Sequence, residues 1–306
     1  TLPTVGDNYI LVNESGNTLE TTVKVGTLNV LPLAMENTTT TIADNEHVYN
    51  GKAITPTVTV TGYNDISIPA DGNWKLVYVN SSDTEADEAK DVGTYTVIAR
   101  ATGSNLAGEK EVGMLTITPK QVSTASTEIT IEAGSPVYDG TAKQPTSLVV
   151  KDGEQTIPAT NYVATYSNNV NAGVNTARVT LTMMGNYEGT VVRSYTIKQR
   201  PVTVTAKEQT IVEGEVIRTG DGTATASAVD GNPDSGLVSG HTLKSASVST
   251  NEQAVGTYQQ GLTVSGALIV AGENDVTDNY AITYAPGQLN IVPQVTAADL
   301  TIEAIP

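Results

Sequence analysis

The chain of 306 residues has no cysteine and no phenylalanine, one tryptophan, and two histidines, His47 and His241. Without cysteine it has no disulfide framework, no thiol catalysis and no Cys-type zinc site. Two histidines leave little material for imidazole acid–base or metal chemistry. No apolar run approaches the roughly 18 residues that a membrane span needs, so no membrane insertion is expected within this segment.

Basic residues are also scarce. Lys and Arg number 16 against 33 Asp and Glu, which gives a formal net charge of −17. Proteins bind a phosphate backbone by neutralising it with Lys and Arg, so this balance argues against nucleic acid as a partner. The same charge repels anionic membrane surfaces.

What the sequence has in quantity is β-forming residues. It contains 47 Thr and 36 Val, and apolar and polar residues alternate in runs of four to eight residues between Gly, Asn, Asp and Pro clusters. Clear examples lie at 57–60, 94–98, 179–182 and 202–205. The pattern predicts an all-β tandem array of small Ig-like β-sandwich domains. The alternative is β-grasp-like units with one short helix, for which 83–90 and 236–243 are the candidate helical segments.

Three landmarks recur in the same order along the chain. The first is a Tyr-Asn/Asp-Gly turn, at Tyr49 to Gly51 and again at Tyr138 to Gly140. The second is a glycine that opens a β-rich run, found at Gly93, Gly173 and Gly256. The third is a closing strand at or near a proline, at 114–122, 194–202 and 288–295.

These landmarks predict three full repeats with short, proline-restricted linkers. Residues 1–33 match the closing portion of a repeat, and 294–304 match the opening of one. The expected division is 1–33, the closing part of a preceding repeat; 34–120, 121–200 and 201–293, three full repeats; and 294–306, the start of a following repeat.

The middle repeat, beginning VYDGTAKQP at 137–145, resembles the YDG-type repeat of large bacterial surface proteins, and the first repeat is a diverged relative of it. The third, with PVTVTAKEQTIVEG, AVGTY and DNYAITYAPGQLNIVP, resembles the related MBG-type repeat of bacterial adhesins. It departs from that pattern at Glu213-Gly214, where Tyr-Gly is usual, and at His241, where Asp is usual. The resemblance implies secretion, a cell-surface location, tandem arrays and a stalk or adhesive role, with neighbouring repeats as partners.

Aromatic residues are the candidate ligand contacts. Tyr recurs at the landmarks, which favours a packing role with the hydroxyl near a loop, although exposed Tyr can stack on sugar rings. Trp74 occurs once, in the first full repeat with Tyr63 and Tyr78 nearby. Trp74, Tyr63 and Tyr78 are therefore either a site for a host or microbial surface glycan or protein, or packing residues.

Five carboxylates lie between residues 83 and 91, among them Asp83, Glu85 and Asp87. Oxygen ligands at alternate positions suit Ca²⁺, which makes this stretch the candidate metal site and Ca²⁺ the candidate cofactor. A solvated acidic insertion is the other interpretation, because no glycine occupies the turn that an EF-hand-like loop needs.

No catalytic motif is present. The serines lack a nucleophile-elbow context, and no Gly-rich phosphate loop precedes a helix. The sequence therefore predicts a non-catalytic segment of a secreted bacterial surface protein, acting as an extended adhesin-like stalk. The alternative function is a glycan- or host-protein-binding module that uses the first full repeat around Trp74.

Overall fold

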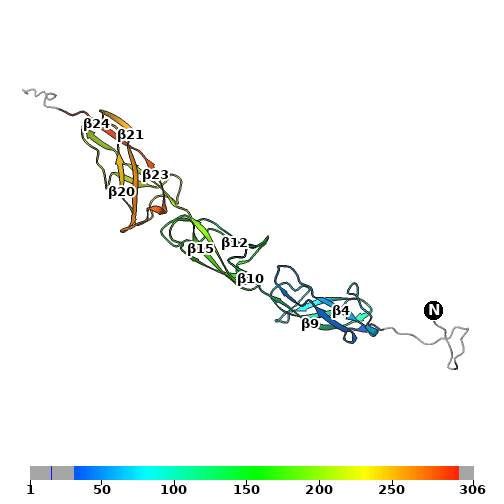
Figure 1. The fold of residues 1–306 in the computed structure, drawn as a ribbon. Helices are drawn as coiled ribbons and strands as arrows, with labels where there is room; N and C mark the ends of the chain where they lie inside the picture. The colour runs from blue at the N-terminus through cyan, green and yellow to red at the C-terminus, as the bar shows by residue number, and fades with distance from the viewer. Residues whose placement is uncertain (1–14, 16–30, 296–306) are drawn as a thin grey trace, which may run out of the picture. The chain divides into compact units, whose positions relative to one another are not determined.

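The computed structural model describes Ser15 and residues 31–295, and strands dominate its ribbon (Figure 1). This confirms the predicted all-β class. The helices of the described residues are single 3-10 turns: Met35–Asn37, Tyr63–Asp65, Ala159–Asn161 and Thr277–Asn279. None of the helices in this part of the chain has the length and apolar character of a membrane span. The repeat fragments expected at 1–33 and 294–306 lie almost wholly outside the described residues.

The chain divides into two compact units. One comprises the residues up to His47 together with Ala53–Ile117, and the other comprises Val48–Lys52 and the chain from Thr118 onward. Every sheet lies within one of three stretches of sequence, 33–118, 120–197 or 200–292. The second unit therefore holds the sheets of the last two stretches, together with the Val48–Lys52 loop.

The first unit contains two larger groups of strands. In one, β2 (Thr39–Ala43) pairs antiparallel with β4 (Thr57–Thr61). The other is a five-stranded sheet in the order β3-β9-β7-β5-β6. Its strands are β3 (Glu46–Val48), β5 (Trp74–Val79), β6 (Glu85–Ala86), β7 (Gly93–Ala101) and β9 (Glu109–Thr118). A short parallel pair joins β1 (Leu33–Ala34) to β8 (Leu106–Ala107).

Alternation of apolar and polar residues places the core of the first unit. Along β7, Tyr95, Val97 and Ala99 are buried while the residues between them are more exposed. Residues of β4, β5, β7 and β8 and of the first 3-10 turn meet in one cluster: Met35, Val60, Trp74, Ala99 and Leu106. Successive side chains of a strand point to opposite faces, so this alternation gives the five-stranded sheet one core face.

Residues 120–197 of the second unit form two sheets. The order β10-β16-β15-β14 describes the four-stranded one, and β11-β12-β13 the three-stranded one. The first is built from β10 (Lys120–Ser123), β14 (Tyr162–Ser167), β15 (Gly173–Met183) and β16 (Tyr187–Ile197). The second is built from β11 (Ile129–Ala133), β12 (Leu148–Asp152) and β13 (Gln155–Thr156). Strand β15 buries Ala177, Val179 and Leu181 completely.

Residues 200–292 also form two sheets, in the orders β19-β17-β23 and β18-β24-β21-β20, with β22 paired to β21. Their strands are β17 (Arg200–Ala206), β18 (Gln209–Val212), β19 (Ala224–Ser227), β20 (His241–Ser249), β21 (Gly256–Ala271), β22 (Asn274–Asp275), β23 (Tyr280–Ala285) and β24 (Gly287–Val292). Val204 of β17 packs in one cluster with Val248, Leu262 and Leu289 of the other sheet. The two sheets thus enclose a common core.

The two expected helices are wrong. In 83–90, Asp83 has a left-handed φ of 55°. Glu85–Ala86 form a strand that pairs with Val79 and Tyr78. A left-handed residue at the start prevents helical propagation, and the pairing with β5 satisfies the backbone instead. In 236–243, Gly236 has φ 79° and β20 begins at His241. The order of acidic and basic residues, and the composition, do not suffice to predict a helix in segments this short.

Four strand pairs are parallel: β1–β8, β10–β16, β17–β23 and β18–β24. Three of them place the strand that opens a stretch beside the strand that follows an asparagine. The register joins Leu33 to Leu106, Lys120 to Tyr187, and Arg200 to Tyr280. These three stretches therefore share one arrangement at the end where the chain enters.

Candidate functional site

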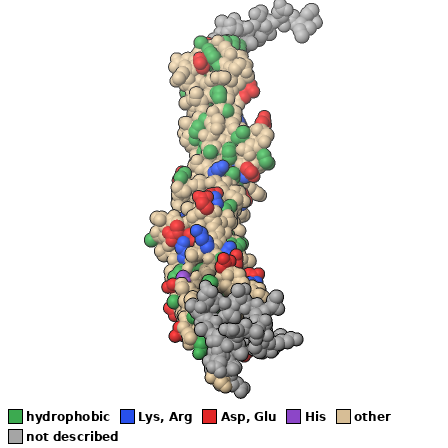
Figure 2. Space-filling model, turned by 90° about the vertical axis from the view of Figure 1, so that its right-hand side faces the viewer, with side chains coloured by type: hydrophobic (Ala, Val, Ile, Leu, Met, Phe, Trp, Pro, Cys, Tyr) green, Lys and Arg blue, Asp and Glu red, His purple; other side chains and the backbone are tan. Residues whose placement is uncertain are grey.

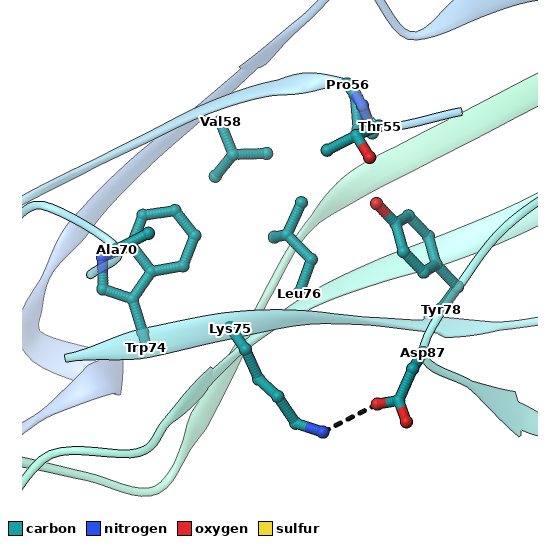
Figure 3. Close-up of a pocket in the computed structure, with 9 residues that line it drawn as sticks. All are labelled: Thr55, Pro56, Val58, Ala70, Trp74, Lys75, Leu76, Tyr78 and Asp87. Carbon is teal, nitrogen blue, oxygen red and sulfur yellow. Dashed lines mark hydrogen bonds and ion pairs between the residues drawn. The ribbon is translucent and has the colours of Figure 1, made fainter. Parts of the chain in front are cut away.

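A hollow of about 370 Å³ opens in the first unit between β4 and β5 (Figure 3). Apolar side chains line it between the two strands, while Lys75 and Asp87 lie on the other side of β5 and form an ion pair with Nζ 2.7 Å from Oδ1. The apolar side chains in the wall are Pro56, Val58, Ala70, Trp74 and Leu76. The charged partners are 50% and 78% exposed, so the pair adds little to stability. The hollow therefore presents mainly apolar and aromatic side chains, and the two charges beside it are already paired with each other.

The aromatic candidates do not share one environment. Trp74 is 7% exposed, and its indole N–H donates to the carbonyl of Ile68 at 2.9 Å. Tyr78 is also buried; burial raises its pKa, and its ring packs edge-on against Tyr95. Tyr63 is 82% exposed, in the second 3-10 turn, and does not line the hollow. The structure therefore brings Trp74 and Tyr78 to the hollow and leaves Tyr63 outside it.

The acidic candidates are occupied by basic partners. Glu85 pairs with Arg100 at 2.8 Å and Asp87 with Lys75, and the hydrogen bonds from these cations lower the pKa of both carboxyls. Asp83 forms the turn before β6. Within residues 31–295, no group of three or more His, Cys, Asp or Glu is arranged to hold a metal ion. Figure 2 likewise shows acidic and basic side chains next to one another on the face it presents.

The landmark glycines occupy equivalent places in their sheets. Gly93, Gly173 and Gly256 open strands β7, β15 and β21. Each pairs with an isoleucine of the neighbouring strand, namely Ile117, Ile197 and Ile291. The shared register shows that this landmark marks the start of a long strand in each stretch.

The landmark tyrosines are buried inside the second unit. Tyr138 packs edge-on against Tyr280, with ring centroids 5.8 Å apart, and lies 6.1 Å from the ring of His241. Tyr49, in the Val48–Lys52 loop, packs edge-on against Tyr187 at 5.3 Å and receives a hydrogen bond from Gln155. Edge-to-face pairs of this kind add about 0.5–1.5 kcal/mol beyond the area they bury. Repetition in the sequence identified both tyrosine loops, but it did not indicate which residues these tyrosines contact. The Asn-Tyr dipeptide that recurs at 186–187 and 279–280 was the signal that could have indicated the contacts.

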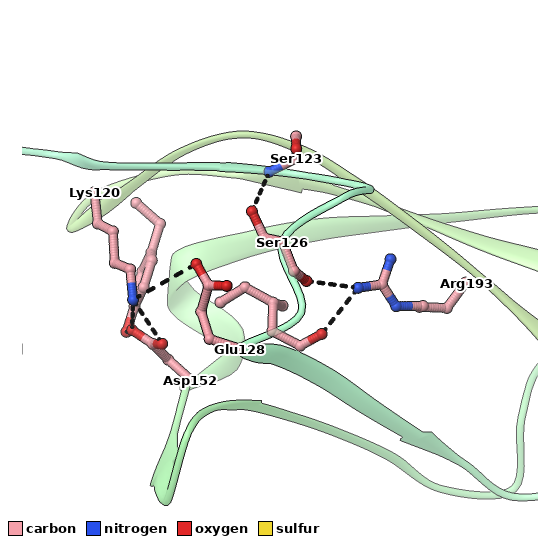
Figure 4. A network of polar contacts seen from close by, with 8 residues as sticks. Lys120, Ser123, Ser126, Glu128, Asp152 and Arg193 are labelled. Carbon is pink, nitrogen blue, oxygen red and sulfur yellow. Dashed lines mark hydrogen bonds and ion pairs between the residues drawn. The ribbon is translucent and has the colours of Figure 1, made fainter.

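A polar network joins Lys120, Glu128 and Asp152 (Figure 4). Lys120 Nζ donates to both oxygens of Asp152, at 2.7 and 2.8 Å, and Glu128 lies 4.0 Å from the same nitrogen. The Tyr187 hydroxyl donates to Asp152 at 3.3 Å; burial raises the pKa of Tyr187, and the nearby carboxylate raises it further. These contacts tie the first residue of β10 to β12 and β16.

Arg193 stabilises the loop between β10 and β11 (Figure 4). Its guanidinium donates to the carbonyls of Thr124, Ser126 and Ile129 at 2.9–3.0 Å. A guanidinium offers five donors in a fixed planar fork, which makes it suited to gather several carbonyl groups. The cluster is a structural element of the fold, with its donors directed at the backbone.

His241 is the titratable group that lies beside Tyr138 and Tyr280. Its Nδ1 lies 2.7 Å from the Tyr280 hydroxyl oxygen, which also accepts a hydrogen bond from the Val238 N–H at 3.1 Å. The ring tautomer decides which of the two groups donates in the contact between Nδ1 and the Tyr280 hydroxyl. Burial lowers the pKa of His241 below its ordinary 6.5. Two charged side chains act on the neighbouring tyrosines, whose pKa values burial raises. The negative charge of Asp139 raises the pKa of Tyr138 further, and the positive charge of Arg200 partly offsets the rise in the pKa of Tyr280.

We expect the second unit to lose stability as the pH falls below about 6.5, the ordinary pKa of histidine. Above that pH His241 is neutral in both the folded and the unfolded chain. Below it the unfolded chain binds the proton first, so the free energy of unfolding falls until the pH passes the lowered folded pKa. Calorimetry from pH 7.5 to 5 should show a flatter profile for His241→Gln. Parallel profiles for wild type and variant would contradict this assignment, and His47→Gln, which removes the other histidine, is the control.

No protein-family model matches the chain, and no curated protein matches it.

Proposed function

We propose that the chain is a non-catalytic segment of a secreted bacterial surface protein, in which tandem β domains form an extended, adhesin-like stalk. One observation carries the proposal. The recurrent Tyr-Asp-Gly motif directs its aromatic ring into packing with the stretch that follows, since Tyr138 is 2% exposed against Tyr280 and His241. A motif used to join consecutive repeats suits a protein whose task is to span distance.

The resemblance to YDG-type and MBG-type repeats supports the same proposal. It supplies the cell-surface location and the tandem organisation, and the net charge of −17 suits a surface exposed to solvent. For the fold of each repeat we propose a small β-sandwich. Ig-like sandwiches are built from antiparallel sheets, and the four parallel pairs depart from that pattern. The β-grasp-like alternative is less well supported, because the helices of the described residues are single 3-10 turns.

Small-angle scattering of the full chain tests the stalk. A single globule of this length has a radius of gyration of about 19 Å. We expect a clearly larger value and a long tail in the distance distribution, because each repeat of such an array contacts mainly its sequence neighbours. A value near 19 Å at low concentration would overturn the stalk proposal.

The second candidate function is a binding module for a host or microbial surface glycan or protein, which uses the hollow beside Trp74. The observation that favours it is the hollow itself, which Trp74, Leu76 and Tyr78 of β5 line together with Val58 of β4. A glycan array probed with wild type and with Leu76→Asp, which places a charge in the wall, tests it. Binding lost in the variant supports the module; absence of binding to any glycan or to host-cell protein at high concentration argues against it.

Calcium remains a proposal with its own test. If Asp83, Glu85 and Asp87 bind Ca²⁺, excess calcium should raise the melting temperature of the first unit and a chelator should lower it. Because Glu85 and Asp87 already pair with Arg100 and Lys75, we expect an unchanged melting temperature, which calorimetry with calcium or with EDTA measures. A rise of several degrees with calcium would show that the ion displaces those pairs.

A further inference from the structure

The end at which the chain enters each stretch carries the same turn. The opening strand pairs in parallel with the residue after an asparagine: Leu106 after Asn105, Tyr187 after Asn186, and Tyr280 after Asn279. The opening backbone N–H groups of Leu33 and Lys120 also donate to Asn105 and Asn186. We call this feature the Asn-turn. It has the same position and the same parallel pairing each time, the hydrogen bond to the asparagine carbonyl in the first two stretches, and an aromatic residue in the last two.

A loop follows an early strand of each stretch, and its first residue again has one backbone partner. Tyr49 N donates to Thr118 O, Tyr138 N to Lys198 O, and Glu213 N to Val292 O, at 2.8–2.9 Å. The acceptors directly follow the isoleucines that pair with the landmark glycines. We call this feature the Tyr-loop. It occupies the end at which the chain leaves each stretch, and in the third stretch glutamate replaces the tyrosine.

We infer that the Tyr-loop and the Asn-turn are complementary docking elements, and that the partner recognised by each is a neighbouring repeat of the same kind. The inference rests on the proposed tandem-array function and names its interaction surface. In the second unit, the loop at Tyr138 contacts the turn at Tyr280, and the loop at Tyr49 contacts the turn at Tyr187. All four rings are 5% exposed or less.

The glycine of the loop brings its backbone close to the following stretch. Gly140 has φ 81°, a left-handed conformation, and a Cβ at this position would lie 3.3 Å from Val238 Cγ1 and 3.7 Å from His241. Glycine adopts positive φ without the steric cost of a Cβ. The Tyr-x-Gly sequence thus supplies both the ring that inserts and the close backbone approach.

Polar contacts fix the orientation of the same joint. Asn279 is 6% exposed, and its side-chain oxygen accepts the N–H of Ala172, at 2.7 Å, in the loop before Gly173. Gln199 Nε2 donates to the Asp278 carbonyl at 2.8 Å. Buried polar groups are costly unless they are hydrogen-bonded, so Asn279 favours a neighbour that presents a backbone N–H at this position. Asn279 and Tyr280 therefore recognise different groups of the preceding repeat: Asn279 a backbone N–H, and Tyr280 an aromatic ring.

The exceptions define the specificity of the pair. The first stretch has Leu106 where an acceptor tyrosine stands elsewhere, and the third has Glu213 where an inserting tyrosine stands elsewhere. Both matched pairs thus use tyrosine on both sides. A loop with Glu213 lacks the ring that the Asn-turn receives, so the third repeat does not offer this docking element to a repeat with an Asn-Tyr turn.

The test is calorimetry with hydrogen exchange on the full chain. In the wild type we expect residues 120–197 and 200–292 to unfold together and to share their slowest exchange. Tyr138→Ala should separate them into two transitions and lower the melting of 200–292 by about 4 °C or more. Tyr138→Phe keeps the ring and should preserve the joint transition. Tyr138→Leu provides the milder probe if the alanine variant fails to fold.

Two controls separate docking from general loss of stability. Tyr166→Ala removes an edge-on pair inside the second stretch, with Tyr195 at 6.3 Å, and should lower stability without splitting the transition. In a double-mutant cycle, Tyr138→Ala and Tyr280→Ala should be strongly non-additive. Additive effects, or splitting by Tyr166→Ala as well, would overturn the docking inference. A stalk that is extended by scattering but shows additive effects would retain the proposed function and lose only the docking pair.

Discussion

Replacing Trp74 by alanine is expected to lower the free energy of unfolding of the first unit by about 3–5 kcal/mol. The indole belongs to the cluster with Met35, Val60 and Ala99, so its removal leaves a cavity that the two sheets cannot fill. It also leaves the Ile68 carbonyl without its indole donor. Because this is the only tryptophan, the measurement is calorimetry or circular dichroism rather than fluorescence.

The matched control is Tyr63→Ala. Tyr63 is 82% exposed, so we expect a change within about 0.5 kcal/mol. The pair of variants also separates the two functional hypotheses for these aromatics. A Trp74→Ala variant that keeps its melting temperature and loses a ligand would show that the indole serves binding; a melting temperature that falls by many degrees shows that it serves the core.

Replacing Gly189 by alanine is expected to destabilise the second unit by more than about 3 kcal/mol. Gly189 pairs with Val122 of β10, has φ 112°, and a Cβ there would lie 2.0 Å from the Val122 carbonyl oxygen. Positive φ alone costs a non-glycine residue about 1–3 kcal/mol. The close carbonyl adds to this cost because it is backbone, and the parallel pairing of β10 with β16 must shift to relieve the contact.

Gly108 provides the matched control in the first unit. It also has a positive φ, 80°, but nothing lies within 4 Å of a Cβ built there. Gly108→Ala should therefore show the conformational cost alone, about 1–3 kcal/mol. Equal losses in the two variants, measured by thermal unfolding of the full chain, would mean that the Val122 carbonyl moves away freely and that the β10 pairing is loose.

The sequence predicted the strands well because burial alternates along them. The runs at 57–60, 94–98, 179–182 and 202–205 are all strands, with Val60, Val97, Val179 and Val204 buried. The segment 83–90 failed as a helix because it turns back to pair with β5, and because Glu85 pairs with Arg100, 15 residues further along the chain. The order of charges within the segment carries no information about such contacts.

The candidate sites were predictable in part. The Tyr-x-Gly loops were found from repetition alone, but their partners Tyr187 and Tyr280 depend on which end of a sheet meets which loop. The environment of Trp74 likewise depends on how β4 covers β5, which one sequence does not reveal. Repetition identifies which residues matter, while the strand pairing determines what they contact.

The parallel pairing of β18 with β24 determines how these two strands respond to tension. Gln209 to Val212 run beside Leu289 to Val292 in the same direction. A pull on the entering end of β18 and the leaving end of β24 therefore slides the two strands past each other, in shear, and loads all their hydrogen bonds at once. Antiparallel strands pulled apart from one end would instead break these bonds one after another. Tension along these two strands is therefore resisted by all their hydrogen bonds together.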